Sequence, residues 1–123
     1  MDQLVTYVPK PPGARAIARR LEDVRCESGF RSLRAFWLRL GEERDGVVVW
    51  TDREGVERTI SYPAVKNYHS FVRQKYREPP LYYLLRVSEL FGYRAQWLLT
   101  GKGPRTDAED RARLGVKDLA DLF

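Results

Sequence analysis

Residues 77–105 have the sequence REPPLYYLLRVSELFGYRAQWLLTGKGPR, which predicts two helices separated by a glycine. Pro79-Pro80 breaks the preceding segment and suits the first turn of a helix. Apolar residues then recur at helical spacing up to Gly92, and a shorter helix follows and ends at Gly101. The side chains expected in the core of this segment are Leu81, Leu84, Leu85, Phe91, Trp97 and Leu98.

Three further helices are predicted on the N-terminal side of this segment. Residues 14–28 have apolar side chains at helical spacing and stop at Gly29. Ser32 suits the N-cap of a second helix, which is predicted over the sequence SLRAFWLRLGEER. Ser61 suits the N-cap of a third helix over about residues 62–74, with a proline in its first turn.

A β-hairpin is predicted between the second and third helices, over about residues 46–61. The sequence GVVVWTDREGVERTIS has two runs rich in β-branched and aromatic residues around a polar turn at residues 52–55. Because a two-stranded hairpin is only marginally stable alone, it must pack on another element, and Trp50 is the expected anchor.

The two ends of the chain differ from the central part. Residues 1–12 end in several prolines, which predicts an extended N-terminal arm. Residues 13–105 are expected to form one mainly α domain that contains the hairpin. Residues 106–123 have apolar side chains at helical spacing, and this amphipathic tail is a candidate dimerisation helix.

Basic residues are concentrated in one part of the sequence. The 123-residue chain has a formal net charge of +5. Residues 63–105 contain eight basic and two acidic residues, so this stretch alone carries +6, whereas residues 106–123 carry −2. A basic surface of this kind favours a polyanion such as DNA as the partner, and the alternative is a solubilising surface.

Other classes of protein have little support in the sequence. No apolar run approaches the ~18–20 residues that span a membrane. One cysteine, Cys26, allows no internal disulfide, so a cytoplasmic protein is expected and the thiol is predicted to be partly buried and inert. His69 is the single histidine and is predicted to be a surface or hydrogen-bonding group. We expect no metal site, no cofactor and no catalytic site.

Residues 77–105 resemble the end of the helix-turn-helix domain in the lambda repressor/Cro-like family. In that family a helix opens with proline and ends in Phe/Leu-Gly, and a short helix then carries Trp-Leu-Leu-Thr-Gly. Residues 16–30, 32–41 and 61–70 look like the first, second and third helices of the family. The resemblance implies a five-helix domain whose third helix enters the major groove, and dimers that bind palindromic sites.

The chain departs from the family pattern in three places. Residues 41–60 separate the second and third helices, where the family has a turn of a few residues. The glutamine that the family often has early in its second helix is replaced here by Ser32 or Leu33. The loop after the third helix, FVRQKYRE, is longer than usual and has no glycine.

The third helix is the predicted DNA-reading element. Val65 and Tyr68 are expected to anchor it, while short or fork-like polar groups on its outer side reach base edges. The residues predicted to face outward are Tyr62, Lys66, Asn67 and Ser70. The basic residues predicted to contact phosphates after the helix are Arg73, Lys75 and Arg77.

The sequence leaves three hypotheses for the hairpin. It could act as a wing that places Arg53 or Arg58 on the DNA. It could offer strand Val47–Trp50 as an exposed edge for pairing with a second copy. It could also pack on its own core as an elaborated loop.

Together these features predict a sequence-specific DNA-binding transcription regulator that is phage or prophage repressor-like. Its partners would be double-stranded DNA and a second copy of the chain. The alternative is a protein-interaction adaptor that binds RNA polymerase or a toxin through an exposed Trp50 and the tail.

Overall fold

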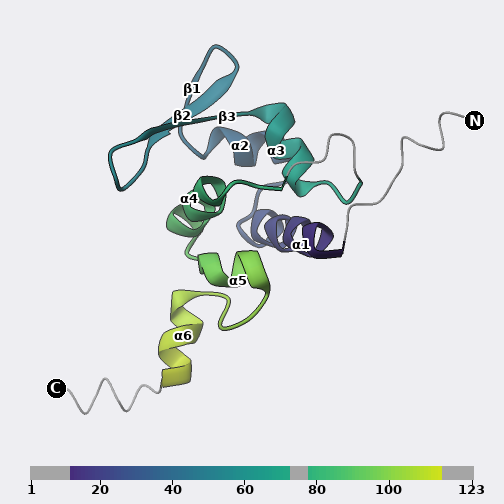
Figure 1. The fold of residues 1–123 in the computed structure, drawn as a ribbon, viewed down its shortest axis with the longest axis vertical. Helices are drawn as coiled ribbons and strands as arrows, with labels where there is room; N and C mark the ends of the chain where they lie inside the picture. The colour runs from purple at the N-terminus through teal and green to yellow at the C-terminus, as the bar shows by residue number, and fades with distance from the viewer. Residues whose placement is uncertain (1–11, 73–77, 115–123) are drawn as a thin grey trace, which may run out of the picture.

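A computed structural model describes residues 12–72 and 78–114, over which the chain forms six helices and one antiparallel sheet (Figure 1). The class is mainly α with an inserted sheet, as predicted at that level. The elements are α1 (Pro12–Glu27), α2 (Leu33–Leu38), β1 (Glu42–Arg44), β2 (Val47–Thr51), β3 (Glu57–Ser61), α3 (Tyr62–His69), α4 (Leu81–Phe91), α5 (Ala95–Thr100) and α6 (Asp107–Leu114).

Four of the predicted helix ends are confirmed by the structure, namely the starts of α2 and α3 and the ends of α4 and α5. The hydroxyl oxygens of Ser32 and Ser61 each accept a hydrogen bond from the backbone N–H three residues further on, at 3.1 and 3.3 Å. Gly92 and Gly101 end α4 and α5 in the left-handed conformation, which glycine adopts without a Cβ clash. A local signal therefore defines one end of each of these four helices.

Helix α3 is shorter than predicted, because it ends at His69 instead of residue 74. Ser70 is extended, and its hydroxyl accepts a bond from the backbone N–H of Val72. Such a local side-chain contact competes with continued helix. Val72 therefore lies beyond the helix, and the predicted phosphate contacts Arg73, Lys75 and Arg77 lie outside the described residues.

The insertion is a three-stranded sheet, so the predicted hairpin is only part of it. The β2–β3 hairpin is confirmed, but Glu42–Arg44 form β1 instead of continuing the second helix. Asp45 and Gly46 both have positive φ, at 52° and 85°, as a tight hairpin turn requires. This Asp-Gly pair was the sequence signal for β1.

Strand β1 overturns the exposed-edge hypothesis for the insertion. The strand order is β1-β2-β3, so β2 is central: Val47–Val49 pair with β1 on one edge, and the whole strand pairs with β3 on the other. The strand Val47–Trp50, predicted as a free edge, is therefore not open to a second copy.

Trp50 is the anchor of the sheet, as predicted. Its side chain is 6% exposed, its ring centroid lies 6.1 Å from that of Tyr82, and the guanidinium of Arg86 lies 5.5 Å from it. Both partners belong to α4, so the insertion packs on its own domain. The adaptor hypothesis placed an exposed Trp50 in the interface with the partner, and the buried Trp50 side chain cannot serve there.

The core gathers side chains from α1 to α5 and from the inner face of the sheet. Leu84, Trp97 and Leu98 are buried as predicted, and Phe91 packs against them. Leu81 and Leu85 were predicted in this core but are 60% and 49% exposed. The reason is that α4 buries the face formed by Tyr83, Leu84 and Val87.

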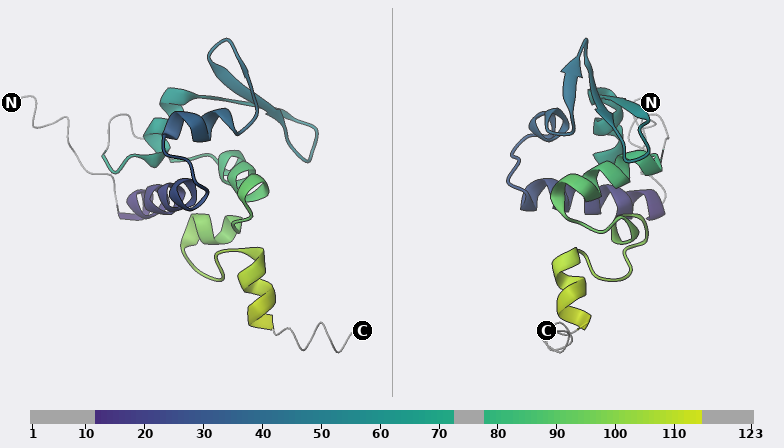
Figure 2. Two further views of the ribbon diagram at one scale, coloured as in Figure 1. Left: turned by 180° about the vertical axis from the view of Figure 1, so that it is seen from behind. Right: turned by 90° about the vertical axis from the view of Figure 1, so that its left-hand side faces the viewer.

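The sheet and α6 lie at opposite ends of the molecule (Figures 1 and 2). Helix α6 confirms that the predicted tail is helical at its start. An ion pair of 2.7 Å between Arg94 and Asp110 holds it, together with a pairing of Tyr93 with Thr106. Residues 1–11 of the predicted arm and residues 115–123 of the tail lie outside the described residues.

Gly41, between α2 and β1, packs closely against the backbone of β2, and a substitution there tests this contact. A Cβ at this position would lie 2.3 Å from the carbonyl oxygen of Val49. We expect Gly41→Ala to lower the free energy of unfolding by about 1–3 kcal/mol, because backbone must move to relieve the clash. Urea unfolding measures this change.

Gly13→Ala is the matched control. A Cβ there meets nothing within 4 Å, and the residue lies in the first turn of α1. This variant should be neutral or more stable, since alanine favours helix over glycine. Equal losses in the two variants would contradict the packing described for Gly41.

Candidate nucleic-acid interface

Helix α3 lies against α1 and α2, next to the point where the sheet leaves the body (Figure 1). Val65, Tyr68 and His69 are buried and form its inner side. The two predicted anchors, Val65 and Tyr68, are therefore confirmed. Of the polar residues predicted to face outward, Lys66 is exposed on α3.

The start of α3 is held against α2 by one buried hydrogen bond. The indole N–H of Trp37 donates to the carbonyl of Ile60 at 3.0 Å, and the Trp37 side chain is 2% exposed. The ring of Tyr62 lies 5.5 Å from that of Trp37. The chain thus returns from the sheet to α2, and α2 and α3 pack together despite the insertion.

The end of α3 is held by a buried network around His69. Its Nδ1 lies 2.8 Å from Oε2 of Glu22 on α1, and its Nε2 lies 2.6 Å from the hydroxyl of Tyr83 on α4. Glu22 also accepts from Arg25, which in turn donates to the carbonyl of Phe30. Three helices are therefore joined at one imidazole.

The network perturbs the acidity of its members. Burial alone would raise the pKa of Glu22, but hydrogen bonds from His69 and Arg25 and their positive charge lower this pKa to about 2. Burial raises the pKa of Tyr83 well above its usual value, and the nearby carboxylate of Glu22 adds to this effect. At neutral pH Glu22 is therefore ionised and Tyr83 keeps its proton.

A cationic group surrounds Tyr62 on the outer side of α2 and α3. The guanidinium of Arg34 and the ammonium of Lys66 lie 5.6 and 5.7 Å from the centroid of the Tyr62 ring. Arg34 and Lys66 are exposed, and Tyr62 is half-buried. Within residues 12–72 and 78–114, neither cation has a carboxylate partner. We call Arg34, Tyr62 and Lys66 the Tyr62 cluster.

The structure brings together only some of the predicted site residues. Tyr62 and Lys66 are adjacent, whereas Asn67 and Ser70 are half-buried, so the prediction that Asn67 is as exposed as Lys66 is wrong. Sequence reasoning missed Arg34. The signal for it was its place three positions before Trp37 on the second helix, which puts the two side chains on the same face, and its guanidinium lies 5.4 Å from the Trp37 ring.

Arg53 and Arg58 lie apart from the Tyr62 cluster. Arg58 donates to Asp52 at 3.0 Å, and its guanidinium lies 5.0 Å from the ring centroid of Tyr82 on α4. Arg53 pairs with Glu89 of α4 at 3.6 Å. Both arginines are therefore engaged at α4, and the contacts described for them do not join them to α3.

Cys26 and His69 differ from the predictions made for them. Cys26 is exposed, because it follows Val24 by two positions and so lies on the far side of α1 from the core. His69 is hydrogen-bonded, as one alternative held, but it is 4% exposed and so is not a surface residue. In the part of the chain that the structure describes, no three metal-ligating side chains are grouped.

None of the helices in residues 12–72 and 78–114 is long and apolar enough to cross a membrane. The described residues define a small mainly α domain with an antiparallel sheet inserted between α2 and α3. Comparison with known proteins finds no matching family model, no matching curated protein and no matching solved structure.

The Glu22 network predicts a specific acid sensitivity. The folded state lowers the pKa of Glu22 from its usual 4.5 to about 2, so the unfolded state binds the proton more readily. The stabilisation is present above pH 4.5 and is lost as the pH falls toward 2. Because 28% of the Glu22 side chain is exposed, we expect it to be worth about 1–2 kcal/mol.

Urea unfolding of wild type and Glu22→Gln between pH 7 and pH 2 measures this contribution. Wild type should be more stable at neutral pH, and the difference should close on acidification. Asp23→Asn, which removes the neighbouring exposed carboxylate of α1, controls for loss of one charge. A difference between wild type and Glu22→Gln that is constant with pH would contradict the assignment.

Proposed function

We propose that this chain is a sequence-specific DNA-binding transcription regulator in which α1 to α5 form a lambda repressor-like helix-turn-helix domain. The observation that carries the proposal is the Tyr62 cluster, whose two cations have no carboxylate partner in the described residues. Such cations on the outer side of two packed helices suit a polyanionic partner.

The chemistry of α3 supports major-groove binding. Its inner side is fixed by Val65 and by the His69 network, so its outer side is presented on a rigid element. Lys66 can donate to O6 and N7 of guanine, and Arg34 can pair with a backbone phosphate. Tyr62, which lies within 6 Å of both cations, can donate through its hydroxyl.

Two further exposed cations flank α2. Arg31 precedes the helix and Arg39 follows it, and neither has an ion-pair partner within residues 12–72 and 78–114. Phosphate contacts from such residues would fix the register of α3 without reading sequence. The phage or prophage repressor-like assignment and the cytoplasmic location rest on the family resemblance and on the single cysteine.

Selection from random double-stranded DNA at several salt concentrations tests the proposal. We expect one short motif to be enriched, with affinity that falls steeply as salt rises. Absence of both enrichment and salt-sensitive binding would favour the adaptor alternative, in which the chain binds RNA polymerase or a toxin.

Two variants separate base contact from phosphate contact. Lys66→Ala should weaken binding to the selected motif by about 5- to 150-fold, or about 1–3 kcal/mol, and relax its sequence preference. Arg34→Ala should weaken binding to DNA of any sequence by a similar factor. It should also reduce the slope of log affinity against log salt concentration by about 0.9. Fluorescence anisotropy measures both.

Lys102→Ala is the matched control, because Lys102 is an exposed cation in the loop after α5. It should leave the preference for the motif unchanged. If Lys66→Ala and Lys102→Ala behave alike, α3 is not the reading element.

We also propose that the regulator acts as a homodimer and that the tail contributes to it. Two copies would place two α3 helices about one turn of DNA apart on a palindromic site. Deleting residues 106–123 should lower the mass found by sedimentation equilibrium. Asp110→Asn is the control that loosens the Arg94 contact without shortening the chain. An unchanged mass after the deletion would remove the tail from the interface.

A further inference from the structure

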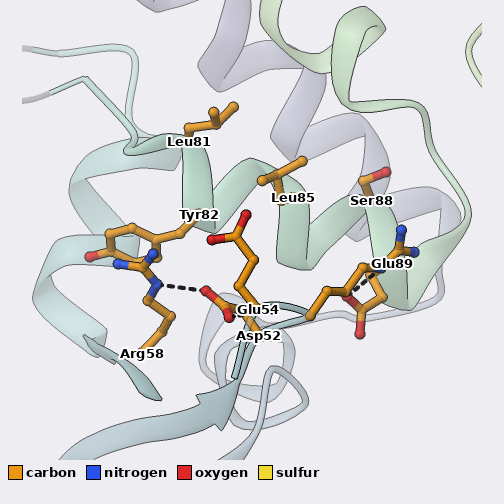
Figure 3. Close-up of a pocket in the computed structure, with 9 residues that line it drawn as sticks. Asp52, Glu54, Arg58, Leu81, Tyr82, Leu85, Ser88 and Glu89 are labelled. Atoms are coloured by element: carbon orange, nitrogen blue, oxygen red, sulfur yellow. Dashed lines mark hydrogen bonds and ion pairs between the residues drawn. The ribbon is translucent and has the colours of Figure 1, made fainter. Parts of the chain in front are cut away.

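A groove of about 490 Å³ lies between α4 and the turn that joins β2 to β3 (Figure 3). It is separate from the Tyr62 cluster, since none of that cluster's side chains lines it. The groove exists because the inserted sheet packs on α4 through Trp50 and holds its turn above the exposed side of the helix.

The floor of the groove is apolar and open. Leu81 and Leu85 stand one helical turn apart on α4 and are 60% and 49% exposed. The ring of Tyr82 lies beside them at the groove wall. Leucine side chains this exposed at the bottom of a groove indicate a surface that another molecule can cover.

The opposite wall is a rigid turn. The Asp52 carboxylate accepts hydrogen bonds from the backbone N–H groups of Glu54 and Val56, both at 2.9 Å. Gly55 has φ of +83°, and its N–H donates to the carbonyl of Asp52. Because the wall is fixed by its own contacts, a ligand would meet a largely preformed site.

The charges of the groove are unequal. Three carboxylates and two guanidinium groups line it. Arg58 pairs with Asp52 at 3.0 Å, and Glu89 is shared between Arg86 at 3.1 Å and Arg53 at 3.6 Å. Glu54 has no ion-pair partner within residues 12–72 and 78–114, and in Figure 3 its side chain points from the turn toward Tyr82 and Leu85. One carboxylate therefore remains beside the exposed leucines to receive a cation.

We propose that this groove binds an amphipathic peptide segment of another protein, with apolar side chains over Leu81 and Leu85 and a lysine or arginine beside Glu54. The apolar side chains of such a peptide would cover the two exposed leucines of the floor, and its cation would pair with the carboxylate of Glu54. This partner site is independent of DNA binding and goes beyond it, because it uses α4 and the insertion instead of α3.

Charge argues against the tail of this chain as the occupant. Residues 115–123 contain Lys117 but also Asp118 and Asp121, so the segment is acidic overall. An acidic segment would be repelled by Glu54. The same argument applies to the tail of a second copy, so the groove fits a basic partner segment better.

Selection of a displayed library of random 12-residue peptides on the full-length chain tests the proposal. We expect the enriched peptides to combine apolar residues with lysine or arginine. Synthetic copies should bind Leu81→Ser/Leu85→Ser at least 10-fold more weakly than wild type. Leu99→Ser is the matched control, since Leu99 is 48% exposed on α5 and lies outside the groove.

A charge reversal tests the cation site separately. The Glu54→Lys variant should bind the basic peptides more weakly than wild type does. It should instead bind peptides in which the lysine or arginine is replaced by glutamate. Failure to enrich peptides, enrichment of acidic peptides, or binding unaffected by the leucine substitutions would each overturn the proposal. Lys66→Ala should leave peptide binding unchanged, so the result is distinguishable from success or failure of DNA binding.

Discussion

The indole N–H of Trp37 donates to the carbonyl of Ile60 inside the core, and this bond sets where the insertion ends. The proposed helix-turn-helix needs α2 and α3 in contact, yet residues 39–61, which include the whole sheet, lie between them in the chain. Because Ile60 is pinned to α2, Tyr62 begins α3 beside Trp37. The sheet therefore extends away from the two helices without separating them.

A second constraint acts at the other end of α3. His69 uses both ring nitrogens, one toward α1 and one toward α4, so it fixes the helix in rotation as well as in position. A short helix of eight residues gains little stability from its own hydrogen bonds, and tertiary contacts must hold it. Because these two anchors lie on the inner side and at the ends of α3, the exposed side chain of Lys66 is not needed to hold the helix in place.

Local signals made much of the fold predictable from sequence. The capping serines, the glycines that end α4 and α5, and the hairpin of β2 and β3 were all predicted correctly, because each depends on neighbours in the chain. Two failures were also local, since β1 follows from the Asp45-Gly46 turn and the early end of α3 from the contact between Ser70 and Val72. The other failures involve tertiary contacts. Leu81 and Leu85 follow the helical period of a core face, but only packing decides that Tyr83 and Val87 are buried instead. The Tyr62 cluster joins α2 to α3 through space, so the sequence indicated Lys66 but gave no reason to pair it with Arg34.

The central position of β2 also bears on aggregation. Val47–Trp50 combines high β-propensity with no charge, which is the composition of segments that recruit identical strands into fibres. In the folded chain, Glu42–Arg44 cover one side of this strand and Glu57–Ser61 the other, and both covering strands carry charged residues. The two-residue turn at Asp45 and Gly46 therefore limits aggregation. It places β1 beside β2, so that the aggregation-prone strand lies between two charged strands.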